Sequence, residues 1–425
     1  MTIDVLNNRP GSRFGLFKGD GVIWVIFFFL CAISLLEVFS ASSFLTYKSG
    51  SILSPIRNHA TYLFIGWLVV VLTHNVPCRW FKFYPFLIGP VAVICLLILS
   101  FSKAMTNGAA RWLEIPGVGV TFQPSELAKG VVVIGVAFIL SFLQTEKGAD
   151  RHAFKYILWV SVPFIVLIFF ENFSTAFILG LVVLMMMFVG RVPFSQIGKL
   201  LGILAVAIGA FAFFLIVTPD STLNHIPNGH RFATWKHRVQ HFMPGNTKEV
   251  APEDFDIDKE AQVAHANIAI ATSNVVGKFP GNSVERDFLS HAFSDFIFAI
   301  IIEEMGLIGC AFVVLLYVVL LFRAGKIANK CERNFPAFLV LGLSLLLVTQ
   351  AFVNMMVAVG LFPVTGQPLP LVSKGGSSTL INCLYIGMIL SVSRFAKRRV
   401  TSTNQRQEVA TAVNEDEFTR TDGMA

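Results

Sequence analysis

The sequence predicts an all-α, polytopic integral membrane protein with ten transmembrane helices. The chain of 425 residues is 55% hydrophobic and only 14% charged, and its mean hydropathy is +0.69. Ten apolar segments are each close to the roughly 20 residues that a helix needs to cross a bilayer. This composition excludes an ordinary soluble domain, which needs a larger share of charged residues for its surface.

The ten apolar segments divide the chain into a membrane domain and two polar ends. We expect spans over residues 22–42, 59–77, 85–102, 128–145, 154–171, 173–190, 198–217, 295–322, 336–358 and 377–394. Residues 1–21 precede the membrane domain, which covers 22–398, and a tail over 399–425 has the composition of a disordered segment. Residues 218–294 are too long for a simple connection between the seventh and eighth spans.

The distribution of basic residues predicts the orientation. The short loops on one side carry 18 Lys and Arg residues, and those on the other side carry six. Because basic loops stay in the cytoplasm, both termini are expected there and the loop 218–294 is expected outside. The first span has no small-residue cleavage site and is interpreted as a retained anchor. The net charge of +7 follows from this topology and requires no nucleic acid.

The long loop contains helix and turn signals. Apolar residues recur at helical spacing among basic ones over 232–242, which predicts an amphipathic helix at the membrane interface. A second helix is expected over 259–276. The Gly and Pro residues of VVGKFPGNS, 275–283, predict turns.

Three acids mark the eighth span. Asp295 stands at its outer mouth, and Glu303 and Glu304 lie deeper. An ionisable side chain in or beside a span is a functional candidate, although Asp295 at this position could instead cap the helix. At 100° per residue, Glu303 is about 80° and Glu304 about 180° round from Asp295, so the three form no single cluster. We expect the two glutamates in the bundle interior, bonded to neighbouring helices.

A second polar stretch precedes the fourth span. Arg111 and Trp112 fall in an outward loop, and Pro124 suits a first helical turn. Glu126 and Lys129 are three residues apart and share a helix face. This pair either seals the helix end as an ion pair or forms a polar wall whose cation meets a phosphate. Arg111 beside Trp112 suits a sugar phosphate, since it offers a bidentate cation next to a flat apolar ring.

A third polar stretch, GLFPVTGQPLPLVSKGGSSTLIN, precedes the last span. Lys374, two glycines, Ser377 and Ser378 stand immediately before the helix. Free backbone N–H groups and the positive end of the helix dipole there favour an anion, although capping explains the same residues. The three stretches are distant in sequence and all fall on the outer side, which favours one shared anionic ligand.

Four segments in this order resemble the SEDS family (shape, elongation, division and sporulation). They are RWLEIPGVGVTFQPSELAK, GKFPGNS, SDFIFAIIIEEMG and FPVTGQPLPLVSKGGSS. The resemblance covers about residues 20 to 398, and GHRFATWKHRVQHFMPG resembles the division branch more than the elongation branch. The chain departs from the family pattern at Glu171, at Gln367 and at Lys374, where an aromatic residue is common.

The resemblance implies a peptidoglycan glycosyltransferase of the cytoplasmic (inner) membrane, acting in cell division at the septum. Its substrate would be lipid II, a disaccharide-pentapeptide on undecaprenyl pyrophosphate, and the transfer would invert the anomeric carbon with Asp295 as general base. Substrate binding is expected from Arg111, Trp112, Gln123, Ser125, Glu126, Lys129, His291, Lys374, Ser377 and Ser378. A divalent cation, Mg or Mn, would suit the pyrophosphate, although the sequence shows no dedicated ligand set for it.

The resemblance also implies partners. Family members work with a cognate single-pass class B penicillin-binding transpeptidase and with other proteins of the division machinery. Two other functions stay open. A lipid II flippase or transporter would move labelled lipid II between leaflets without making polymer, and a non-catalytic division scaffold would tolerate changes at the site.

Overall fold

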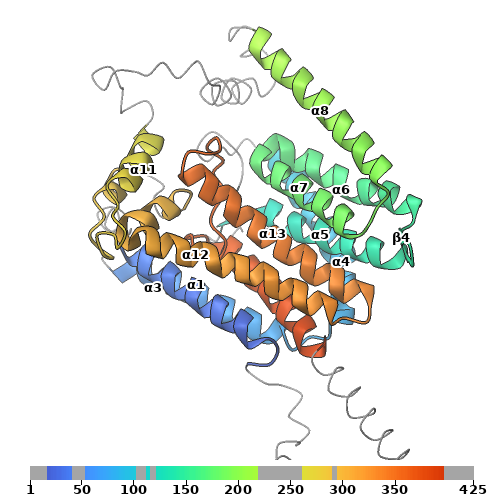
Figure 1. Cartoon of the computed structure of the whole chain (residues 1–425), viewed down its shortest axis with the longest axis horizontal. Coiled ribbons are helices and arrows are strands. Elements are labelled where there is room, and N and C mark those ends of the chain that lie inside the picture. Colours follow the sequence, from blue (N-terminus) through green and yellow to red (C-terminus); the bar gives the residue numbers. More distant parts are fainter. Residues whose placement is uncertain are drawn as a thin grey trace, which may run out of the picture.

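The computed structural model is a bundle of long helices (Figure 1). It describes residues 17–40, 53–101, 112–114, 121–218, 261–289 and 294–396. Nine helices in these ranges are long and apolar enough to cross a membrane, and Phe173–Val189 is a shorter apolar helix of 17 residues. The predicted helical membrane fold is therefore confirmed.

The observed helices follow the predicted spans closely. They are α1 (Gly21–Ser40), α3 (Leu53–Thr73), α4 (Tyr84–Phe101), α5 (Pro124–Phe142), α6 (Arg151–Glu171), α7 (Phe173–Val189), α8 (Phe194–Val217), α12 (Ile297–Asn329), α13 (Asn334–Ala358) and a last helix, Gly376–Ala396. The largest differences are at two helix ends: α3 begins at Leu53 and not at the predicted residue 59, and α12 ends at Asn329 and not at the predicted residue 322. The short 3-10 helix η2 (Cys78–Phe83) joins α3 to α4.

Two short antiparallel hairpins lie between the helices and were not predicted. β1 (Leu113–Glu114) pairs with β2 (Thr121–Phe122) just before α5. β3 (Gln144–Thr145) pairs with β4 (Gly148–Ala149) between α5 and α6. Strands of two residues are too short to show the alternating pattern that reveals a strand in a sequence.

The core of the bundle lies around α5 and α13. In Figure 1, α13 runs between α12 and α5, and it packs against both. Small residues allow the helices to approach closely, as is common in membranes. A Cβ on Gly130 would lie 2.6 Å from Oη of Tyr385, and this Oη donates to the carbonyl of Glu126 at 2.7 Å. Gly130 thus lets the last helix contact the first turn of α5.

The helix α12 is interrupted at Gly306, whose backbone angles (φ 66°, ψ −166°) are not helical. Residues 274–279 fill the interruption. Lys278 N donates to Glu303 O at 2.9 Å, Phe279 N to Glu304 O at 2.8 Å, Leu307 N to Asn274 O at 3.3 Å and Ile308 N to Val275 O at 3.2 Å. The backbone groups that a broken helix leaves open are therefore paired with this loop, as buried backbone requires.

Two glycines make this contact possible. A Cβ on Gly306 would lie 2.4 Å from Gly277 N and Val275 O, and a Cβ on Gly277 would lie 2.4 Å from Glu304 O and Gly306 N. Both residues also have positive φ, 66° at Gly306 and 80° at Gly277. Only glycine combines this conformation with so close a backbone approach.

Glu303 and Glu304 are fully buried and hold the same loop by their side chains. The donors to Glu303 are Lys278 Nζ at 2.7 Å, Ser283 Oγ at 2.5 Å and Val284 N at 3.1 Å. Glu304 accepts from Ser40 of α1, and Nη1 of Arg286 is 3.8 Å away. The two acids lie in the interior as expected, but loop 278–286 supplies most of their partners.

The long loop is described only in part. The predicted interfacial helix over 232–242 lies outside the described residues. The second predicted helix is present as α11 (Ala261–Ala271), which ends before the expected 276. The predicted turns follow it, with positive φ at Gly277 and Gly281.

We expect Gly306→Ala to lower the free energy of unfolding by about 3 kcal/mol, because the new Cβ meets backbone and the φ is unfavourable. Gly325→Ala is the matched control in the same helix, since a Cβ there meets nothing within 4 Å. It should stabilise by up to about 1 kcal/mol. Thermal unfolding in detergent, followed by a thiol-reactive dye that labels the buried Cys78 and Cys383, measures both. Equal melting temperatures for the two variants would contradict this account of the break.

Candidate functional site

A connected set of polar side chains links α5, α7 and α13 to residues 359–375 and to the start of α12. We call it the α13 network, because two amides of that helix stand at its centre. It comprises Glu126, Lys129, Thr175, Ser294, Asp295, Gln350, Asn354, Gln367 and Ser373. The three polar stretches of the sequence therefore meet in one place.

Lys129 joins α5 to α13. Its Nζ lies 2.8 Å from Glu126 Oε1 and donates to Gln350 Oε1 at 2.6 Å. Both charged side chains are only 1% exposed. Gln350 Nε2 donates in turn to the carbonyl of Pro368 at 3.0 Å. A pair so deeply buried is the arrangement expected of a structural ion pair, since a charge in a membrane protein interior needs a partner.

Asn354 binds two irregular segments at once. Its Nδ2 donates to the backbone carbonyl of Asp295 at 2.9 Å and to that of Gln367 at 2.7 Å. Gln367 Nε2 donates to Thr175 Oγ1 of α7 at 2.8 Å. The non-helical stretch 359–375 is thereby tied to α13 and α7, which satisfies backbone groups that have no helical partner.

Asp295 lies directly before α12 and is half-buried. Ser294 Oγ donates to its Oδ1 at 3.0 Å. Phe296 occupies the N-cap position of α12, and its side chain makes no capping hydrogen bond. The alternative explanation of Asp295 as a side-chain N-cap is therefore not what the structure shows, and its carboxylate is held beside the helix start by Ser294.

Lys374 approaches the same place from the last polar stretch. Ser373 Oγ donates to the carbonyl of Ser294 at 2.6 Å. Asp295 follows Ser294 in the chain and Lys374 follows Ser373, so this bond brings the backbone of the two charged residues together. Lys374 is half-buried and interacts electrostatically with His59 of α3. Burial lowers the pKa of the Lys374 ammonium from its usual 10.5, because a low-dielectric surrounding disfavours the charged form.

Ser377 and Ser378 are in the first turn of the helix Gly376–Ala396. The expectation that both precede the helix is wrong, because the helix already begins at the second glycine. Ser377 Oγ accepts from the backbone N–H of Gln123 at 3.3 Å, which connects the second and third polar stretches. Asn382 Nδ2 lies 3.5 Å from Ser378 Oγ.

The remaining predicted residues are placed as follows. Gln123 is buried at the N-cap of α5, and Pro124 occupies the first helical turn as predicted. Ser125 is buried beside them. Trp112 is 37% exposed, directly before β1. Arg111 and His291 lie outside the described residues, so their expected roles stay predictions.

Three buried polar atoms around the network have no hydrogen-bond partner within the described part of the chain. They are Ser125 Oγ, Glu126 Oε2 and Asn354 Oδ1. Buried polar atoms are normally paired, so these are positions where a water or a polar group of a ligand can bind. Within the described ranges, no group of three or more His, Cys, Asp or Glu could hold a metal ion.

Sequence reasoning missed the amides that organise the site. Gln350 and Asn354 stand four residues apart in an otherwise apolar helix, VTQAFVNMM, and therefore on one face. Polar side chains inside a span are functional candidates, so this signal was available. Ser373 and Thr175 carry no comparable signal, because small hydroxyl residues are common in membrane helices and loops.

Comparisons with known proteins identify the family of the chain. The cell cycle protein family of FtsW, RodA and SpoVE matches residues 21–398. A relative from Halomonas elongata, named probable peptidoglycan glycosyltransferase FtsW, is 29% identical over 349 residues, which are 80% of this chain and 82% of the relative.

Solved structures share the fold. One chain of a peptidoglycan synthase complex, described as coordinating polymerization and crosslinking, matches with a TM-score of 0.66 and 22% identity, over 89% of this chain and 98% of that one. The rod shape determining protein RodA of Thermus thermophilus matches with a TM-score of 0.61 and 21% identity, over 88% and 97%. The resemblance seen in the sequence is confirmed, and the chain belongs to the FtsW, RodA and SpoVE family of cell cycle proteins.

Proposed function

We propose that this chain is a peptidoglycan glycosyltransferase that polymerises lipid II at the outer face of the cytoplasmic membrane during septal division. The name of the Halomonas elongata relative supports the activity. The observation that carries the assignment of Asp295 is its position. It is the half-buried carboxylate at the point where the α13 network joins the three polar stretches.

Asp295 acts as the general base. Its carboxylate takes the proton of the acceptor sugar's 4-hydroxyl while that oxygen attacks the anomeric carbon of the donor. A new bond forms from this oxygen to the anomeric carbon, and the bond from that carbon to the pyrophosphate breaks with inversion. Ser294 Oγ, 3.0 Å from Oδ1, holds the carboxylate in one orientation for this transfer.

The leaving pyrophosphate needs positive charge. Lys374 supplies this charge. It follows Ser373, whose Oγ donates to the carbonyl of Ser294, the residue before Asp295. The first turn of the helix Gly376–Ala396 adds backbone N–H groups. Arg111 contributes a guanidinium beside Trp112, whose ring packs on the sugar or the isoprenoid.

Lys129 is a positioning residue in this proposal. Glu126 already balances its charge at 2.8 Å, and both side chains are buried. Its effect on the reaction passes through Gln350, which holds the carbonyl of Pro368. The role proposed for Glu126 and Lys129 is therefore to align residues 359–375, and not to contact the substrate as the sequence predicted.

The cellular setting follows from the family. The solved complex that shares this fold combines polymerization with crosslinking, and we infer a crosslinking partner, a class B penicillin-binding transpeptidase, for this chain as well. We infer from the loop charges that both termini lie in the cytoplasm. This leaves Asp295 outside, where lipid II is displayed.

Asp295→Asn should lower glycan polymerisation at least about 100-fold, because an amide cannot take up the proton. The fold should be unaffected, since the amide oxygen can still accept from Ser294. Polymer made from labelled lipid II by the purified full chain, with its transpeptidase partner, measures the effect. Asp150→Asn is the control, since that exposed residue caps α6. Unchanged polymer length and rate in Asp295→Asn would contradict its role as the base. Lipid transport without any polymer in the wild type would contradict the proposed polymerase activity.

Gln350→Met should lower kcat by about 10- to 100-fold and leave KM for lipid II unchanged, because it misaligns residues 359–375 without removing a substrate contact. The Lys129–Glu126 pair remains in this variant. Ser344→Ala is the matched control, a buried residue of α13 outside the network. A normal kcat in Gln350→Met, together with a raised KM in Lys129→Met, would instead favour direct contact of Lys129 with the substrate.

The alkaline limit of activity should depend on Lys374. Its charge is present at low pH and is lost as the pH rises through a pKa that burial holds below 10.5. As the pH rises, polymerisation by the wild type should therefore begin to decline before pH 10.5 is reached. Lys374→Arg should extend activity to higher pH, since a guanidinium stays charged. Identical alkaline profiles of the two proteins would show that this ammonium does not serve the leaving group.

A further inference from the structure

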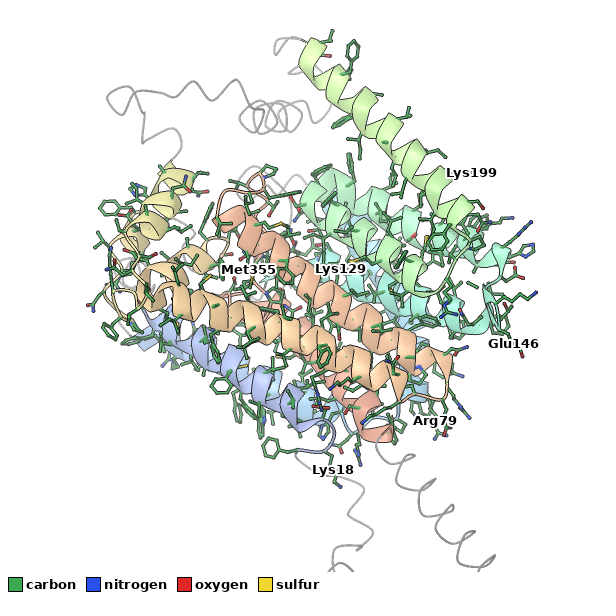
Figure 2. All side chains as sticks on the ribbon, viewed as in Figure 1. Lys18, Arg79, Lys129, Glu146, Lys199 and Met355 are labelled. Carbon is green, nitrogen blue, oxygen red and sulfur yellow. The ribbon has the colours of Figure 1, made fainter. Side chains whose placement is uncertain are left out.

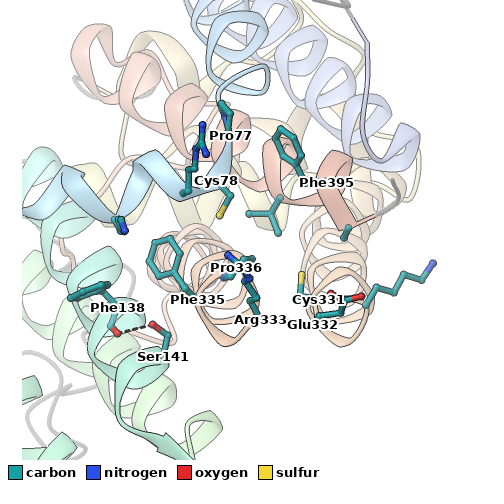
Figure 3. Close-up of a pocket in the computed structure, with 15 residues that line it drawn as sticks. Pro77, Cys78, Phe138, Ser141, Cys331, Glu332, Arg333, Phe335, Pro336 and Phe395 are labelled. Carbon is teal, nitrogen blue, oxygen red and sulfur yellow. Dashed lines mark hydrogen bonds between the residues drawn. The ribbon is translucent and has the colours of Figure 1, made fainter. Parts of the chain in front are cut away.

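A cavity lies at the end of the bundle away from α11. Figure 2 shows Arg79, one of its lining residues, at that end. The cavity has a volume of about 550 Å³ and is formed by η2, the turn from α12 to α13, the end of α5 and the end of the last helix. In Figure 3, Arg333 and Phe335 face Cys78 and Phe395 across it. The loop charges place this end in the cytoplasm, opposite the candidate site.

The cavity is strongly basic. Arg79, Lys82, Lys330 and Arg333 line it, against one acid, Glu332. Within the described residues, none of the four cations forms an ion pair with a carboxylate. Arg79 and Lys82 lie over the rings of their neighbours Trp80 and Phe83, at 5.9 and 5.1 Å, and such contacts leave N–H donors available. The charge of this cavity is complementary to an anion.

The other residues that line the cavity are mostly apolar, and one of them also lines a second hollow. Phe138 lines the basic cavity and also a groove of about 740 Å³ between α4, α5 and α6. Apolar side chains such as Phe86 and Trp159 line most of this groove. Gly89 and Gly135 keep it open, because neither places a side chain in it.

The two hollows adjoin along the chain as well. Lys82 lines the cavity and Pro85 and Phe86 line the groove, at the junction of η2 and α4. At the end of α5, Ser141 lines the cavity and Phe142 lines the groove. A ligand that spans both must carry an anionic group at one end and a long apolar chain at the other.

We propose that these two hollows form a binding site for an anionic phospholipid of the inner leaflet. The phosphate of the head group binds in the basic cavity, where cations between membrane helices on the cytoplasmic side recognise such groups. An acyl chain passes Phe138 and lies in the groove between α4, α5 and α6. The occupant is a lipid because its phosphate complements the four cations of the cavity and its acyl chain complements the apolar lining of the 740 Å³ groove.

The test measures phosphatidylglycerol retained by the purified full chain in a neutral detergent, by native mass spectrometry. The combined variant Arg79→Gln, Lys330→Gln and Arg333→Gln should weaken phosphatidylglycerol binding by about tenfold or more and leave the weak binding of zwitterionic phosphatidylcholine unchanged. The matched control, Lys147→Gln, Arg151→Gln and Lys199→Gln, removes the same charge from exposed residues of the same side that do not line the cavity. It should change binding by less than about twofold.

A second variant tests the acyl groove separately. Gly89→Leu fills it, because the first added carbon meets Val131 at an ordinary 3.5 Å and the rest of the side chain enters the groove. It should also weaken phosphatidylglycerol binding, although no charge is lost. Glycerol 3-phosphate, which has the anion without acyl chains, should bind about 100-fold more weakly or worse.

Four results would overturn the proposal. Equal losses in the cavity variant and in its control would mean that only general basic charge attracts the lipid. Unchanged binding in Gly89→Leu, or equal binding of glycerol 3-phosphate, would remove the acyl chain from the groove. If the full chain binds no phosphatidylglycerol until Glu415→Gln, Asp416→Asn and Glu417→Gln are introduced, its own acidic tail occupies the cavity.

Discussion

The structure depends on one constraint, which is that irregular backbone inside a membrane bundle must find every hydrogen bond within the protein. Residues 359–375 leave the helical conformation between α13 and the last helix, and the carbonyls of this stretch that are buried in the bundle need partners from the protein. Gln350 and Asn354 meet this need by donating to the carbonyls of Pro368 and Gln367. The same Asn354 also binds the carbonyl of Asp295, so the residues proposed for chemistry are aligned by the bonds that stabilise the fold.

The interruption of α12 meets the same constraint with a different partner. Here the loop 274–279 supplies the backbone groups, and the carboxylates of Glu303 and Glu304 fix the residues that follow it. These two acids are therefore explained by the loop that they hold, whereas Asp295 stays half-exposed at the helix start. Three acids within ten residues of sequence are thus separated, because Asp295 precedes α12 whereas Glu303 and Glu304 lie inside it.

The sequence predicted the spans well because a helix that crosses a membrane is recognised by its length and its apolar composition. It also brought together the correct three stretches, since topology placed each of them on one side of the membrane. The role of Glu126 and Lys129 could not be decided from spacing, because an ion pair and a substrate contact need the same separation of three residues. The pairing of 274–279 with α12 was beyond prediction, since main-chain hydrogen bonds leave almost no trace in side-chain identity.

The close contact between Gly277 and Gly306 limits which substitutions this protein can tolerate at these two positions. The obstacle to a side chain at either position is the main chain of the other, and no substitution can make a main chain smaller. A larger residue at one position therefore cannot be compensated by a substitution at the other. Two packed side chains differ in this respect, because a smaller residue at one position can make room for a larger one at its neighbour. Any descendant sequence that carries a larger residue at one of them must therefore have a different backbone path in residues 274–279 or at the interruption of α12.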